Sequence, residues 1–363
     1  MNNRKIRVAI THGDINGISY EVILKALEDT RLLELCTPVV YGSAKIAAFY
    51  RKSLDMPQLP FVQIESADAI KDGSYNIINV VGEDTKIEPG VSSETAGRAA
   101  FAALERAVTD LRAGEVDVLV TAPINKKNIQ SDTFKFPGHT EYLEASLGNE
   151  GDKAMMILCN DSIRVALATI HIPLADVPKS LSTDLIAERI RTLNASLRRD
   201  FGIPSPRIAV LSLNPHAGEE GLLGSEERDI IIPAIEEAKD RKILAFGPYA
   251  VDGFFGIGRF VKFDGILAMY HDQGLAPFKA LAMDNGINFT AGLPFVRTSP
   301  DHGTGYDIAG RGEASPESMR QAIYAAIDIF RNRQREDVAT RHPLRRQYYD
   351  KGSDNVVLDL TSD

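Results

Sequence analysis

Residues 6–28 read IRVAITHGDINGISYEVILKALE, and this stretch contains the pattern that decides the fold. The apolar run at 6–11 predicts a buried strand, and the spacing of apolar residues over 19–28 predicts a helix. Gly13 and Gly17 lie in the connection between the two. A strand that leads through a short turn into a helix is the building unit of α/β proteins.

The same alternation continues along the chain. Further strands are expected at 76–81, 116–121, 163–169, 208–213 and 266–270, and further helices at 93–112, 183–199 and 226–240. The triplet Ser315-Pro316-Glu317 supplies a capping side chain, a first-turn proline and an acid, so a last helix is expected to begin there and to end near 331–336. The sequence therefore predicts an α/β fold, and no repeat or Pro/Gly-rich linker indicates a domain boundary.

Length and composition restrict the class of protein. A chain of 363 residues is long enough for two domains, and its formal net charge of -9 argues against broad binding to nucleic acid or to an anionic membrane. Cys36 and Cys159 do not form a CxxC pattern, so neither a disulfide framework nor a thiolate metal site is indicated. No apolar run approaches about 18 residues, and we expect a cytoplasmic enzyme that acts on a small molecule.

Three strand-like runs are each followed closely by a histidine. VALATIH ends at His171, AVLSLNPH at His216 and ILAMYH at His271. Ligands of α/β sheets bind beyond the carboxyl ends of strands, where three neutral imidazoles could hold one divalent cation. The alternative is that each is an ordinary loop histidine, and His12, which also follows a strand, shows that the pattern can arise without a metal.

A second group of residues is suited to an anion. Lys279, Asn288 and Arg297 offer a point charge, an amide and a donor fork, which together fit a phosphate monoester. His139 and Thr140, in FPGHTEYL, stand at the expected start of a helix, where backbone amides favour anions. The alternatives are solvated surface charges for the cations and a plain capping role for Thr140.

Two common nucleotide motifs are missing. Gly256-Ile257-Gly258 and Gly303-Thr304-Gly305 lack the third glycine of a dinucleotide fingerprint, and there is no phosphate-binding loop of the GxxxxGK type. The residues alone therefore indicate a metal-dependent enzyme for a phosphorylated small molecule, with the reaction left open.

Eight motifs in order, between Thr11 and Gly312, resemble the 4-hydroxythreonine-4-phosphate dehydrogenase family of pyridoxal phosphate biosynthesis. They read THGDINGISYEVILKAL, VTAPINKKNI, FPGHTEYL, HIPL, NPHAGEEGLLGSEE, GPYAVDGFF, YHDQGLAPFKAL and GLPFVRTSPDHGTGYDIAGRG. The resemblance implies oxidation of 4-phosphohydroxy-L-threonine by NAD or NADP to 2-amino-3-oxo-4-phosphooxybutanoate, which decarboxylates to 3-amino-2-oxopropyl phosphate.

The resemblance also implies roles for individual residues. The ligands of one divalent metal (zinc, cobalt, magnesium, manganese or nickel) would be His171, His216 and His271. Asp252 and Asp272 become candidates for proton transfer or for orienting the ligands. The implied substrate contacts are His139, Thr140, Lys279, Asn288 and Arg297. No cofactor-binding residue is assigned.

The implied architecture is that of isocitrate and isopropylmalate dehydrogenases, with two α/β domains flanking a cleft. We expect residues 1–130 plus 275–363 to form an outer domain, and residues 131–274 a central domain with the metal ligands and dimer contacts. The homodimer would share its active sites, each drawing its three histidines from two subunits.

The first motif departs from the family pattern T-x-G-D-P-A-G-I-G-P-E. Ile15, Asn16, Ser19 and Tyr20 replace proline, alanine, glycine and proline, which changes the turn before the helix. We expect the fold to survive. Relatives that oxidise 4-phospho-threonate or a cyclic diol remain alternatives, as does a catalytically silent binding protein, although the retained cationic residues favour a phosphorylated substrate.

Overall fold

The computed structural model describes residues 4–282 and 284–341, and it confirms the α/β class. In this part of the chain the twelve strands form one sheet in the order β3-β4-β2-β1-β5-β12-β11-β6-β7-β10-β8-β9. The strands are β1 Ile6–Thr11, β2 Cys36–Gly42, β3 Val62–Ile64, β4 Asn76–Asn79, β5 Val118–Thr121, β6 Met155–Cys159, β7 Arg164–Leu167, β8 Arg207–Leu211, β9 Leu244–Tyr249, β10 Gly265–Ala268, β11 Ile287–Ala291 and β12 Arg297–Pro300.

Helices cover the sheet and connect its strands. They are α1 Ser19–Leu27, α2 Leu32–Leu35, α3 Ala44–Ser53, α4 Glu94–Arg112, α5 His139–Leu147, α6 Val177–Ser180, α7 Thr183–Arg199, α8 Ile232–Asp240, α9 Val251–Gly256, α10 His271–Ala282 and α11 Glu317–Thr340. Three of them begin with a serine side chain that accepts a backbone N–H: Ser43 for α3, Ser93 for α4 and Ser182 for α7.

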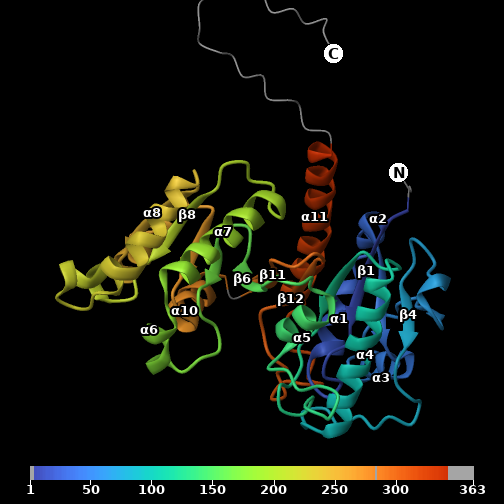
Figure 1. The fold of residues 1–363 in the computed structure, drawn as a ribbon. Helices are drawn as coiled ribbons and strands as arrows, with labels where there is room; N and C mark the ends of the chain where they lie inside the picture. Colours follow the sequence, from blue (N-terminus) through green and yellow to red (C-terminus); the bar gives the residue numbers. More distant parts are fainter. Residues whose placement is uncertain (1–3, 283, 342–363) are drawn as a thin grey trace, which may run out of the picture.

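Two lobes are visible in Figure 1, joined through β6, β11, β12 and α11. From β3 to β12 all neighbouring strands pair in parallel. Three antiparallel pairs follow, β12–β11, β11–β6 and β6–β7, and beyond them β7, β10, β8 and β9 are again parallel to one another. The antiparallel strands therefore separate two parallel halves of one sheet.

The predicted domain boundaries stay a prediction. Helix α10 runs across the boundary expected between residues 274 and 275, and β11, expected in the outer domain, pairs with β6 of the central segment. The part of the expected outer domain after residue 341 lies outside the described residues.

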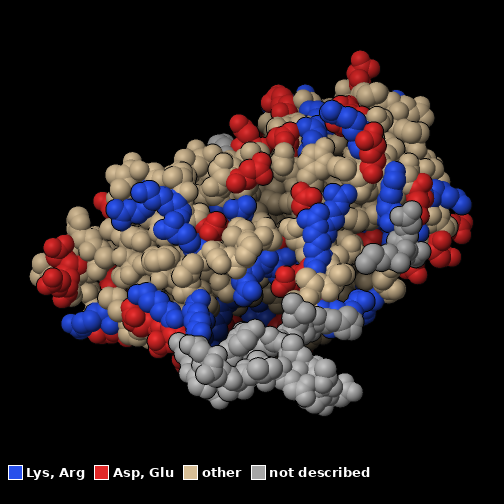
Figure 2. All heavy atoms as spheres, turned by 90° about the horizontal axis from the view of Figure 1, so that it is seen from above, with Lys and Arg blue, Asp and Glu red and all other residues tan. Residues whose placement is uncertain are grey.

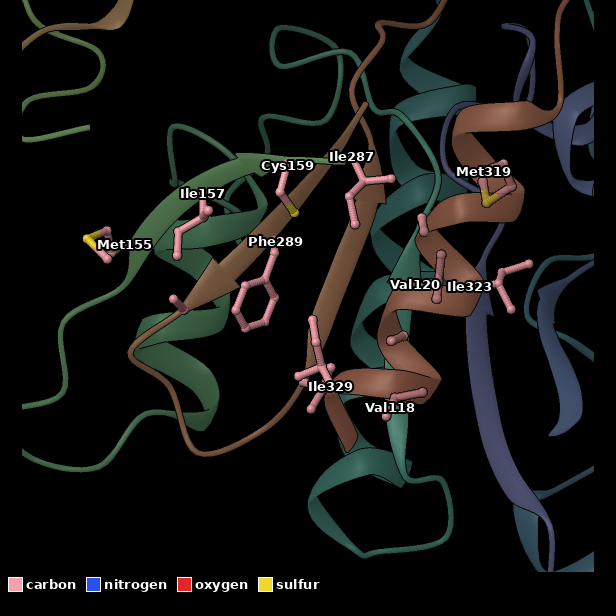
Figure 3. Packing of buried hydrophobic residues seen from close by; sticks show 14 of the residues in the cluster. Val118, Val120, Met155, Ile157, Cys159, Ile287, Phe289, Met319, Ile323 and Ile329 are labelled. Carbon is pink, nitrogen blue, oxygen red and sulfur yellow. The ribbon is translucent and has the colours of Figure 1, made fainter. Parts of the chain in front are cut away.

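One hydrophobic core continues through the junction of the lobes. Figure 3 shows Ile157 of β6 and Phe289 of β11 close to each other, with Val118 of β5 and Ile323 of α11 in the same cluster. All four side chains are buried. Because close-packed cores resist relative movement of their parts, this packing links the two halves of the sheet.

A buried ion pair reinforces the junction. In α11, Arg333 donates through Nε to Asp200 Oδ1 at 2.6 Å and through Nη1 to the Leu293 carbonyl at 3.1 Å. The two charged side chains are only 7% and 4% exposed. The carboxylate of Asp200 also accepts the Ser196 hydroxyl at 2.7 Å, so the end of α7 is held against α11.

Most long elements follow the sequence prediction, with three corrections at helix ends. The last helix begins at Glu317, with Pro316 before it instead of inside it, and it continues to Thr340 instead of ending near 331–336. The segment expected as one helix at 226–240 begins with a π-helical turn, Glu227–Ile231, before α8.

The altered first motif is accommodated as expected. Tyr20 stacks on Tyr50 with ring centroids 5.7 Å apart, and its hydroxyl accepts the Ser43 backbone N–H at 2.8 Å. Asn16 donates through Nδ2 to the Val91 carbonyl at 2.9 Å. The replacements therefore make contacts of their own, and α1 forms.

Figure 2 shows basic and acidic side chains side by side over one face of the molecule. None of the helices in the described ranges combines the length and the apolar character that crossing a membrane requires.

Candidate functional site

The three selected histidines follow three neighbouring strands. His171, His271 and His216 come shortly after β7, β10 and β8, which are adjacent and parallel in the sheet. The carboxyl ends of parallel neighbours lie at the same edge, so the histidines share one edge of the second lobe. By contrast, His12 follows β1 in the first lobe and is buried.

Both ring nitrogens of His12 have hydrogen-bond partners inside the core. Its Nε2 donates to the Ala99 carbonyl at 2.9 Å, and its Nδ1 lies 2.8 Å from the Tyr20 hydroxyl. Burial lowers the pKa of His12 to about 4, so the ring is neutral near pH 7. A neutral imidazole with both nitrogens bonded is structural, which agrees with its exclusion from the ligand set.

His171 and His271 are brought together at the mouth of a cavity. Their ring centroids are 5.7 Å apart, and both line a cavity of about 320 Å³ with Tyr270 and Asp272. The Nδ1–H of His271 donates to Asp272 Oδ1 at 2.7 Å. In the neutral ring this bond leaves the lone pair on Nε2, the arrangement found in many metal-binding histidines.

His216 lies in an adjoining cavity and not beside the other two. That cavity, of about 510 Å³, is lined by His216, Asp252, Tyr270 and Asp272. Within residues 4–282 and 284–341, no group of three or more His, Cys, Asp or Glu side chains is placed to hold a metal ion. Within one chain, His171 and His271 therefore lie close together, whereas His216 lines a cavity with Asp252 and Asp272.

The backbone that carries His216 is unusual. Four residues other than glycine (His216, Ala217, Glu219 and Glu220) have φ between 43° and 55°, in the left-handed region. This region costs about 1 kcal/mol or more for each such residue, so the surrounding contacts must fix the loop.

The main anchor of this loop is the buried carboxylate of Glu227. Its Oε1 accepts the backbone N–H groups of Leu213 and Asn214 at 2.8 and 2.7 Å, and its Oε2 accepts Asn214 Nδ2 at 2.9 Å. A side chain at Gly218 would approach Oε2 to 2.7 Å. Glu227 therefore fixes the segment immediately before His216.

Lys126 is a site residue that the sequence prediction missed. Its Nζ donates to His171 Nε2 at 3.3 Å. Burial lowers the pKa of His171, and the Lys126 charge lowers it further. The motif VTAPINKKNI contains this lysine, but nothing local distinguishes Lys126 from Lys127 beside it.

Arg297 is buried, and among the described residues no carboxylate forms an ion pair with it, although the charge of Glu141 acts on it. Its guanidinium is on β12, its residue is 3% exposed, and it donates to the hydroxyls of Thr121, at 3.0 and 2.6 Å, and of Thr290, at 3.1 Å. Burial lowers its pKa to about 10. A buried cation whose side-chain hydrogen bonds go to hydroxyl groups provides a preformed binding site for an anion.

The sheet register places Asn288 on the same face as Arg297. Thr290 is opposite Arg297 and Asn288 is opposite Ser299, and residues two apart on a strand share a face. The Oδ1 atom of Asn288 is buried and has no hydrogen-bond partner among the described residues. Thr298, on the opposite face, donates to the Ala322 carbonyl of α11, so the Arg297 face points away from that helix.

His139 is the first residue of α5, and it lies close enough to Arg297 and Lys126 to be affected by their charges. Its Nε2 is buried and, among the described residues, has no partner. Burial holds the pKa of His139 well below its usual value, and the charges of Arg297 and Lys126 lower it further. Thr140 is the second residue of α5, where free backbone N–H groups point outward.

Lys279 lies near the histidine edge. Its Nζ in α10 lies 3.7 Å from Asp301 Oδ1. Burial raises the pKa of Asp301, while the charges of Lys279 and His271 lower it. Lys279 and Asp301 therefore lie near His271, although Lys279 and Asp301 are well separated in sequence.

The glycine-rich segment at 303–312 packs against the altered first motif. The Thr304 carbonyl accepts the Ile18 N–H at 2.9 Å and would lie 2.5 Å from a Cβ at Gly17. The Tyr306 hydroxyl donates to Asp14 Oδ2 at 2.6 Å. Gly17 thus allows the two loops to touch, and this junction is where a change in the first motif would act.

Comparisons with known proteins agree on one family. A model described as pyridoxal phosphate biosynthetic protein PdxA matches residues 34–326. A relative from Bacteroides thetaiotaomicron, named 4-hydroxythreonine-4-phosphate dehydrogenase, is 56% identical over 99% of this chain and 98% of its own.

Two solved structures extend the comparison. The 4-hydroxythreonine-4-phosphate dehydrogenase of Klebsiella pneumoniae is 34% identical, with a TM-score of 0.77 over 90% of this chain and 100% of its own. A terephthalate 1,2-cis-dihydrodiol dehydrogenase from Burkholderia xenovorans is 26% identical, with a TM-score of 0.59 over 89% of this chain and 98% of its own.

Proposed function

Because the chain belongs to the PdxA family of pyridoxal phosphate biosynthetic proteins, we propose that it is a 4-hydroxythreonine-4-phosphate dehydrogenase. It oxidises the secondary alcohol of 4-phosphohydroxy-L-threonine with NAD or NADP. The product, 2-amino-3-oxo-4-phosphooxybutanoate, loses its carboxylate as carbon dioxide and leaves 3-amino-2-oxopropyl phosphate.

The observation that carries this proposal is the buried guanidinium of Arg297, which among the described residues is hydrogen-bonded to hydroxyl groups and to no carboxylate. A phosphate monoester supplies a negative charge next to the guanidinium and can accept two parallel N–H hydrogen bonds from it. His139, Thr140, Asn288 and Lys279 complete the proposed phosphate site. The terephthalate diol named for the Burkholderia xenovorans protein carries carboxylates in place of a phosphate, so a direct comparison of the two substrates is needed to separate the two activities.

We propose that His171, His216 and His271 bind a divalent metal. His171 Nε2 accepts a hydrogen bond from Lys126 and so carries a lone pair, and the bond from His271 Nδ1–H to Asp272 directs the Nε2 atom of that ring toward a ligand role. A divalent metal at this position would favour ionisation of the substrate hydroxyl and polarise the ketone formed from it. Asp272 orients His271, and Asp252 stands where it can accept a proton beside His216.

We further propose a homodimer in which each site takes histidines from two subunits. The separation of His216 from His171 and His271 into adjoining cavities supports this arrangement. Sedimentation of the purified protein tests it, and a fully active monomer would contradict it.

A substrate panel tests the proposed activity. We expect metal-loaded enzyme to reduce NAD or NADP with 4-phosphohydroxy-L-threonine at a kcat/KM at least about tenfold above those for 4-phospho-threonate and for a cyclic diol. We expect chelator treatment to remove activity and a divalent ion to restore it. Full activity after chelation, or a preference for the diol, would refute the proposal.

Replacing Glu227 with glutamine is expected to weaken metal binding about tenfold, because the new amide turns a donor toward Asn214 Nδ2 and loosens the loop before His216. Competition of zinc against a chelating dye measures the affinity without turnover. The matched control is Glu226→Gln, since Glu226 also accepts Asn214 Nδ2, at 2.7 Å, but among the described residues it accepts no backbone N–H of this loop. Equal zinc affinities for the two variants would show that Glu227 does not position His216.

A further inference from the structure

Lys126 stands between the two parts of the site. Its Nζ donates to His171 Nε2 at 3.3 Å, and its Cε lies 3.8 Å from the Cβ position of Gly138, the residue before α5. His139, the first residue of α5, feels the Lys126 charge, as His171 does. The ammonium therefore has the metal-binding histidines on one side and the phosphate site on the other.

The charge of Lys126 has no carboxylate partner within salt-bridge distance among the described residues, whereas the Lys279 ammonium lies 3.7 Å from Asp301. A neutral imidazole is a weak acceptor for an ammonium compared with an ionised group. Among the described residues Lys126 thus has no ionised partner in direct contact, although the Glu141 carboxylate lies in the same region, with its Oε2 3.5 Å from the Cβ position of Gly138.

The substrate of the proposed reaction carries two anionic groups. Its phosphate is matched by Arg297 and the residues around it, but none of the residues assigned above matches its carboxylate. The carboxylate is attached to the carbon that bears the amine, and in the proposed site the amine and hydroxyl would face the histidines. Lys126, which contacts His171, is a cation at that end of the proposed site.

We propose that Lys126 binds the substrate carboxylate, a role that rests on the proposed function. The ion pair would select for an amino acid over an amino alcohol with the same phosphate. It would also hold the group that leaves as carbon dioxide, with the carbon–carbon bond breaking and its electrons passing into the neighbouring ketone.

The test compares two ligands by calorimetry without NAD or NADP, so that neither is oxidised. One is 4-phosphohydroxy-L-threonine, and the other is 3-amino-2-hydroxypropyl phosphate, which lacks only the carboxylate. We expect Lys126→Ala to weaken binding of the first about ten- to hundredfold and to leave binding of the second within about twofold. Lys127→Ala, at an exposed neighbour, should change neither Kd.

Each other outcome overturns the inference. Equal weakening of both ligands would assign Lys126 to the phosphate, and no change for either would remove it from substrate binding. Zinc affinity measured on the same variant shows whether the loss acts through His171 instead. If the wild type binds neither ligand, the proposed function fails, and this result is separate from any effect of Lys126.

Discussion

Replacing Arg297 with methionine is expected to reduce kcat/KM by about 10²- to 10³-fold and at the same time to raise the free energy of unfolding by about 1 kcal/mol. The two effects have one cause. In the ligand-free protein the guanidinium is buried against Thr121 and Thr290, and no carboxylate of the described residues lies within salt-bridge distance of it. Removing it therefore relieves a desolvation cost that the charge of Glu141 offsets only in part. With substrate bound, the same charge meets the phosphate, and its loss leaves a buried anion unpaired.

Kinetics and urea denaturation of the same preparation check both parts of this prediction. A thermal shift with inorganic phosphate gives an independent measure, because a ligand that binds only the folded state raises its melting temperature. We expect that shift in the wild type and not in the variant. A variant that is both less stable and still stabilised by phosphate would show that Arg297 is a structural residue.

The second prediction concerns an arginine that is also buried but is paired. Arg333→Met is expected to lower the free energy of unfolding by about 3–5 kcal/mol, because it leaves the Asp200 carboxylate buried without its cation. The ligand contacts should be unaffected, so the KM of the remaining folded enzyme should stay within about twofold of the wild-type value.

Urea denaturation followed by two probes measures this loss and shows whether the lobes unfold together. The double variant Arg333→Met with Asp200→Leu is the control, since removing both charges should recover much of the stability. If the single variant lost less than about 1 kcal/mol, the pair would not contribute to the junction between α7 and α11. Arg297 and Arg333 thus make a matched comparison of a functional and a structural buried charge.

Several elements with a long and regular apolar pattern were predicted from the sequence, whereas β2 and β6 were not, although all their residues are buried. Strand β1 and helix α7 lie where they were expected, since alternation or helical spacing extends over their whole length. Strands β11 and β12 were not predicted, because INFTA and RTSP carry polar residues at the positions that face the anion site. The polar residues of the proposed anion site therefore interrupt the apolar pattern from which a strand is predicted.

The site was predicted unevenly for a similar reason. Strand ends indicated the histidine edge, and the family motifs indicated Arg297 and its neighbours. The contact of Lys126 with His171 joins residues 45 positions apart, and that of Asp200 with Arg333 joins residues 133 apart. Such contacts depend on the tertiary fold, so no local sequence pattern predicts them.

The pairing of β11 with β12 has a consequence for insertions and deletions. Asn288, Thr290 and Arg297 face the anion site, while Phe289 and Thr298 face the core and α11. If one residue were removed from the turn at 292–296 and β12 slid by one position, every side chain on that strand would exchange faces. The buried cation would enter the hydrophobic core, so the length of this turn is fixed as strictly as the identity of the residues beside it.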